Sequence, residues 1–154
     1  MKTRSLNTLP KVLGFALVIL LSAFANPGGD SYTIHLGNQL LTQQYVHMQK
    51  NAPDLTLDES SQDLAIKVYY SHCGQIGKDR QLTIQNKNKI LQKWSYPNAL
   101  SEHNAMKIEV KDLFHLKDLG PDNLDLVYSS KELPEGRILA RFQLSQKVRA
   151  ASGE

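Results

Sequence analysis

The stretch Asp63-Leu-Ala-Ile-Lys-Val-Tyr-Tyr-Ser-His-Cys73 decides the fold of this chain. Apolar and polar side chains alternate along it, and it is rich in β-branched and aromatic residues, which is typical of a strand with one buried face. The side chains expected on the buried face are Leu64, Ile66, Val68 and Tyr70. Because one half-buried strand is not stable alone, further strands must cover its apolar face.

The same alternation recurs along most of the chain. The expected strands lie at residues 32–36, 39–46, 55–57, 80–85, 90–96, 106–110, 123–129 and 137–144. Tight turns are expected at Gly37-Asn38 and at Asn86-Lys-Asn-Lys89. The side chains predicted to face inward are Tyr32, Ile34, Leu41, Tyr45, Leu82, Ile84, Ile90, Trp94, Met106, Ile108, Val110, Leu124, Leu126, Tyr128, Ile138, Ala140, Phe142 and Leu144.

One segment changes period. Residues 111–119 (KDLFHLKDL) place Leu113, Phe114 and Leu116 at helical spacing, and Gly120-Pro121 ends the pattern. Short turns between the strands favour antiparallel pairing, and the alternation leaves one face of each sheet in water. The sequence therefore predicts an all-β fold, an antiparallel two-sheet β-sandwich with one short helical crossover. A jelly roll or a small barrel is the alternative.

The end of the chain resembles the last third of an immunoglobulin-like domain, because a strand, a helical crossover, a strand, a hairpin turn and a strand follow one another. Trp94 on an inner strand agrees with this resemblance. The inter-sheet disulfide of antibody domains is absent, since Cys73 is the single cysteine. The resemblance implies an immunoglobulin-like sandwich and carries no function by itself.

The first 25 residues have the pattern of a secretory signal peptide. Three basic residues and no acid open the segment, residues 12–21 are apolar, and Ala23-Phe-Ala25 is a suitable cleavage site. The apolar run is short for a membrane anchor, so we expect no stable membrane insertion after cleavage. The expected organisation is a signal peptide at 1–25, a flexible lead-in at 26–30, a β-sandwich domain at 31–145 and a disordered tail at 146–154. The protein is then secreted or periplasmic.

Charge and cysteine content exclude two classes of protein. The whole chain has 18 Lys and Arg against 15 Asp and Glu, and Lys2, Arg4 and Lys11 belong to the expected leader. The mature chain is therefore formally neutral, and we expect no nucleic-acid partner, because such partners require a basic surplus. A single cysteine cannot form an intramolecular disulfide, which excludes a disulfide-rich scaffold.

A metal site is the second functional hypothesis. Imidazole, thiolate and thioether groups bind copper and zinc, and the candidate ligands are His72, Cys73, His103, Met106 and His115. Adjacent strand residues point to opposite faces, so His72 and Cys73 cannot reach one ion without a bulge. No spacing typical of a zinc site is present, and the sequence predicts no cofactor.

An unrecognised hydrolase is the third hypothesis. None of the familiar catalytic motifs is present, and Ser71 is only a sequence neighbour of His72. Members of a catalytic triad meet in space and not in sequence, so the sequence names no catalytic residue. The main expectation is a non-catalytic binding module that contacts an extracytoplasmic protein or a polysaccharide.

The expected contact surface is the outer face of the last hairpin. Aligning the apolar faces puts Tyr128 opposite Ile138 and Leu126 opposite Ala140. The same register puts Val127 opposite Leu139 on the outward face, with a polar rim around the pair. Tyr69 would join this surface if its strand lay in the same sheet.

Overall fold

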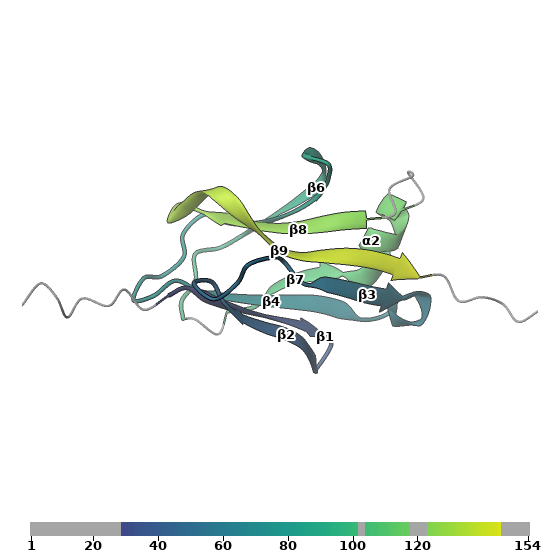
Figure 1. Ribbon diagram of the computed structural model, residues 1–154, viewed down its shortest axis with the longest axis horizontal. Coiled ribbons are helices and arrows are strands. Elements are labelled where there is room, and N and C mark those ends of the chain that lie inside the picture. The colour runs from purple at the N-terminus through teal and green to yellow at the C-terminus, as the bar shows by residue number, and fades with distance from the viewer. Residues whose placement is uncertain (1–28, 102–103, 118–122, 146–154) are drawn as a thin grey trace, which may run out of the picture.

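The computed structural model describes residues 29–101, 104–117 and 123–145, which fold into two stacked sheets and one short helix (Figure 1). The elements are β1 (Ser31–Leu36), β2 (Gln39–Tyr45), β3 (Asp54–Asp58), the 3-10 turn η1 (Glu59–Ser61), β4 (Ala65–Ser71), β5 (Arg80–Asn86), β6 (Lys89–Tyr96), β7 (Met106–Glu109), α2 (Val110–Lys117), β8 (Asn123–Ser130) and β9 (Leu133–Ser145). The expected signal peptide, the first part of the lead-in and the expected tail at 146–154 lie outside the described residues.

Strand β4 forms where the sequence predicts it. Ile66 and Val68 are fully buried and Lys67 between them is not, as the alternation requires. Leu64 is the exception at 42% exposure. It lies outside the strand because β4 begins at Ala65, so its predicted inward orientation is wrong.

The two sheets differ in pairing. The four-stranded sheet has the order β2-β1-β4-β7 and is antiparallel throughout. The five-stranded sheet has the order β3-β9-β8-β5-β6, and β3 pairs parallel with β9. The prediction of purely antiparallel sheets is therefore wrong for this pair. A parallel pair needs a crossover between its strands, and here almost the whole domain separates β3 from β9.

Three hairpins join consecutive strands, and each contains a one-residue bulge at a leucine. The residue that the register skips is Leu41 in β1–β2, Leu91 in β5–β6 and Leu139 in β8–β9, and the β8–β9 register shifts a second time near the turn, between Tyr128 and Ser130. Each skipped leucine follows another apolar residue in the doublets Leu40-Leu41, Ile90-Leu91 and Ile138-Leu139. In each doublet the second side chain packs on the core, and the first is more exposed.

The bulges explain three wrong predictions of side-chain orientation. A shift of one residue moves every following side chain to the other face of a strand. Tyr45 and Ile90 are therefore exposed, at 48% and 60%, although the sequence places both inward. Ile138 is half-buried outside the core, and Leu139 takes the core position in its place.

The turns and the helix agree with the sequence. Gly37 has a φ of 58° in the β1–β2 turn, and Lys87 and Asn88 have φ of 45° and 67° in the β5–β6 turn. Two successive left-handed residues suit the twist of a two-residue hairpin. Helix α2 replaces strand structure where the period changes, and it buries Leu113, Phe114 and Leu116 in the core.

The ends of the sandwich are unlike each other. Helix α2 lies at one end, and the β4–β5 connection and the β8–β9 turn lie at the other (Figure 1). Between the sheets the rings of Tyr32, Tyr70 and Tyr128 form a stacked row, with centroids 6.2 Å and 4.2 Å apart. Among the described residues no helix is long and apolar enough to cross a membrane.

Candidate functional site

The predicted contact pair on the last hairpin is not present. Val127 lies opposite Ile138, and Leu139 is fully buried, so the predicted register and the outward orientation of Leu139 are both wrong. The bulge at Leu139 is the reason, because it advances the register after the Leu126–Ala140 pair. Val127 is half-buried and lies 3.1 Å from the position that a Cβ on Gly136 would occupy.

Tyr69 belongs to the other sheet. It lies on β4, and its ring meets the ring of His35 edge to face, with centroids 5.4 Å apart. Tyr69 is therefore a cross-strand partner of β1 in the four-stranded sheet. It cannot extend a surface on the β8–β9 hairpin, which belongs to the five-stranded sheet.

The predicted metal ligands do not converge among the residues that can be placed. His72 is buried, Cys73 is exposed, Met106 is fully buried in the core, and His115 is exposed on α2. His103 lies outside the described residues. Within the described ranges no group of three or more His, Cys, Asp or Glu side chains is arranged to hold a metal ion.

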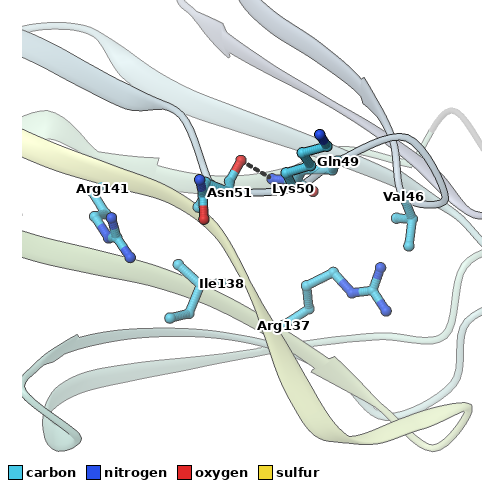
Figure 2. A pocket seen from close by; sticks show the side chains of 8 residues that line it. Val46, Gln49, Lys50, Asn51, Arg137, Ile138 and Arg141 are labelled. Atoms are coloured by element: carbon cyan, nitrogen blue, oxygen red, sulfur yellow. Dashed lines mark hydrogen bonds between the residues drawn. The ribbon is translucent and has the colours of Figure 1, made fainter.

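An open groove of about 470 Å³ runs along β9, and we call it the β9 groove. Strand β9 forms one wall and the connection between β2 and β3 forms the other (Figure 2). Its lining residues are Val46, Gln49, Lys50, Asn51, Ala52, Arg137, Ile138 and Arg141. The bulge builds this wall, because turning Leu139 into the core leaves Arg137 and Ile138 beside the groove.

Gln49 ties the connection to the core. Its side-chain amide donates to the Tyr32 hydroxyl at 2.8 Å and to the carbonyl of Asn51 at 3.2 Å, the bond drawn in Figure 2. The Tyr32 hydroxyl in turn donates to the carbonyl of Leu139 at 2.7 Å. The two walls of the β9 groove are thus joined through one buried phenol. Burial raises the pKa of Tyr32, and the Gln49 hydrogen bond and the charge of Arg137 partly oppose that rise.

The β9 groove is cationic. Lys50, Arg137 and Arg141 line it, and its lining includes no carboxylate. Arg141 is compensated by Asp125, with Nε and Oδ1 3.5 Å apart. Lys50 and Arg137 form no ion pair with any residue in the described part of the chain. Because an unpaired cation beside a groove attracts anions, the β9 groove is suited to a ligand that carries carboxylates or similar groups.

A second arrangement of polar side chains lies at the end opposite α2, and we call it the Asp30–His72–Ser130 cluster. His72 Nδ1 lies 3.3 Å from Asp30 Oδ2, and His72 Nε2 lies 3.1 Å from Ser130 Oγ. The Tyr128 hydroxyl is 3.0 Å from the same Nε2. Asp30 Oδ2 accepts the Tyr70 hydroxyl at 2.9 Å, so one carboxylate holds two aromatic groups in place.

Sequence reasoning missed both of these sites. The β9 groove is formed by segments that only the parallel β3–β9 pairing brings side by side. In the Asp30–His72–Ser130 cluster, Ser130 is 58 residues from His72, and Asp30 lies in the segment predicted to be a flexible lead-in. The bulged leucine doublets are the one local signal in the sequence that bears on the β9 groove.

Comparison with protein families, with curated proteins and with solved structures finds no match to this chain.

Proposed function

We propose that this chain is an exported, immunoglobulin-like binding module that holds an anionic extracytoplasmic ligand in the β9 groove. The ligand is an acidic segment of a protein or an acidic polysaccharide. The observation that carries the proposal is the pair of unpaired cations, Lys50 and Arg137, in an open groove whose lining holds no acid.

The strand order supports the immunoglobulin-like part of the proposal. Immunoglobulin domains place strands A, B and E side by side in one sheet and strands C, F and G in the other. If β1, β4, β5, β7, β8 and β9 correspond to A, B, C, E, F and G, the orders β1-β4-β7 and β9-β8-β5 follow that plan. Strands β2, β3 and β6 are then additions at the sheet edges.

The chemistry of the lining supports an anionic ligand. An arginine presents a planar fork of donors that matches a carboxylate, and each charge-assisted hydrogen bond contributes more than a neutral one. Gln49 and Asn51 add amide groups that can pair with hydroxyl or carbonyl oxygens. Val46 and Ile138 add a small apolar contact, as is usual in a binding groove.

Calorimetric titration with two defined probes, an oligogalacturonate and an oligoglutamate, tests the proposal. We expect at least one probe to bind and its affinity to fall as salt is added. The variant Arg137→Gln should weaken binding about 10-fold or more, since a hydrogen bond to a charged group contributes about 1.5–3 kcal/mol. The double variant with Lys50→Gln should weaken it further.

Lys93→Gln is the matched control, because Lys93 is exposed on β6 and its loss changes the net charge equally. Binding of the oligogalacturonate alone would identify the ligand as a polysaccharide, and binding of the oligoglutamate alone would identify an acidic protein segment. The proposal fails if neither probe binds, or if Lys93→Gln weakens binding as much as Arg137→Gln.

A further inference from the structure

The Asp30–His72–Ser130 cluster has the atom order of a charge-relay site. A carboxylate faces Nδ1 of the imidazole at 3.3 Å, and a serine oxygen faces Nε2 of the same ring at 3.1 Å. In serine hydrolases this arrangement lets the histidine take the proton of the serine while the carboxylate orients the ring. Asp30 directly precedes β1, His72 directly follows β4, and Ser130 is the last residue of β8.

Hydrogen bonds around the cluster fix its geometry. Asp30 Oδ1 accepts the backbone N–H of Cys73 at 3.2 Å, and Oδ2 accepts the Tyr70 hydroxyl, so the carboxylate is anchored from two directions. The ring of His72 packs against the Tyr70 ring with centroids 4.7 Å apart. The backbone N–H of Leu133 donates to Ser130 Oγ at 3.2 Å.

The contacts of His72 favour one tautomer of its ring. A carboxylate at Nδ1 favours the tautomer with the proton on Nδ1, which leaves Nε2 as an acceptor. The Ser130 and Tyr128 hydroxyls are the two donors that approach Nε2. The Glu132 carboxylate, which accepts the Lys78 N–H at 2.9 Å, is a second acceptor beside Ser130.

We propose that Ser130 is a nucleophile, activated by His72 as general base and by Asp30 as the group that orients the imidazole, and that it cleaves small carboxylic esters. Ser130 is only 5% exposed, but it lines a polar depression of about 370 Å³ at the end of the β8–β9 hairpin. The depression is open and is lined by Asp79, Gln81, Ser129, Lys131 and Pro134, so it admits a short acyl group such as acetyl and offers no apolar tunnel for a long chain.

The reaction runs in two halves. The Ser130 oxygen forms a bond to the ester carbonyl carbon as its proton passes to His72 Nε2. The carbonyl electron pair moves onto oxygen, which gives a tetrahedral intermediate. The intermediate then expels the alcohol, which takes the proton from His72 and leaves an acyl-serine.

Water completes the cycle. It attacks the acyl-serine while His72 takes its proton, and the bond to Ser130 breaks as that proton returns to the serine oxygen. The products are a carboxylic acid, an alcohol and free Ser130, so ester and water are consumed one for one.

Labelling of the whole folded chain with diisopropyl fluorophosphate tests the proposal, followed by peptide mass spectrometry. We expect a single phosphoryl adduct on Ser130. Ser130→Ala should abolish it, and His72→Gln should slow it about 100-fold or more, as expected for loss of a general base. Ser60→Ala is the matched control, because Ser60 is an exposed serine on η1 outside the depression, and this variant should label Ser130 at the wild-type rate.

Wild-type labelling decides the question even if a variant of the buried His72 does not fold. Glu132→Gln gives an independent check, because it removes the charge of the competing acceptor beside Ser130 and should make labelling faster. Hydrolysis of p-nitrophenyl acetate should follow the labelling rates across the variants. The proposal is overturned if Ser130 stays unlabelled in the folded wild type, or if folded His72→Gln labels at the wild-type rate.

Discussion

Replacing Leu139 by alanine tests the bulge that builds the β9 groove. Leu139 is fully buried, and Leu→Ala removes three carbons, a transfer loss of about 2.4 kcal/mol at about 0.8 kcal/mol per carbon. The cavity left behind brings the total to about 2.7–5 kcal/mol. With a urea m-value of about 1–3 kcal/mol/M, the midpoint of unfolding should fall by about 1–5 M.

Ile138→Ala is the matched control, because it removes the same number of carbons from the neighbouring half-buried position. It should cost about 1 kcal/mol, roughly half of the transfer term with no cavity. Urea unfolding followed by circular dichroism measures both variants. The unbulged register, which places Ile138 inward and Leu139 outward, predicts the reverse order. A larger loss for Ile138→Ala than for Leu139→Ala would therefore refute the bulge and the wall of the groove with it.

Three further predictions concern the core, the leader and alkaline stability. Ile66→Ala should cost about 2–5 kcal/mol and Lys67→Ala about 0.5 kcal/mol or less; equal losses in urea melts would contradict the register of β4. Mass spectrometry of the exported protein should give Asn26 as its first residue, and a retained leader would contradict cleavage at the predicted site. Burial raises the pKa of Tyr96 from 10.0 to about 12. The unfolded chain loses this phenolic proton at a lower pH than the folded chain does. The contribution of Tyr96 to the free energy of unfolding should therefore be fully present below pH 10 and should fall as the pH rises toward 12. An ordinary tyrosine pKa for Tyr96, assigned in an ultraviolet titration by comparison with Tyr96→Phe, would contradict this.

Alternation predicts a strand well where nothing interrupts its register. Strand β4 pairs with β1 and β7 without a shift, so Ile66, Val68 and Tyr70 are buried as the sequence indicates. Helix α2 is predictable for a similar reason, because its three apolar side chains share one face over two turns.

Alternation fails at the bulges, since one extra residue reverses all orientations beyond it. The doublet Ile138-Leu139 shows that one of two adjacent apolar side chains must face outward. Which of the two does so depends on the turn and on the partner strand, and neither can be read from the doublet. The parallel β3–β9 pair is likewise unpredictable, because almost the whole domain lies between its two strands in the sequence.

The residues of the two candidate sites are the least predictable part. Asp30 has no periodic pattern around it, and it becomes part of a site only when β4 places His72 and Cys73 beside it. Ser130 is one of several serines near turns, and only the stacking of the two sheets brings it to the imidazole. Contacts of this kind are set by tertiary packing, so composition and spacing carry no trace of them.

The most direct test of the proposed binding function is a nuclear magnetic resonance titration of the labelled protein with the tighter of the two anionic probes. We expect the largest shift changes on the side-chain amides of Gln49 and Asn51 and on the Nε–H of Arg137, and we expect them to vanish in high salt. Shift changes concentrated on another face of the sandwich, or none at a probe concentration that saturates binding by calorimetry, would contradict it.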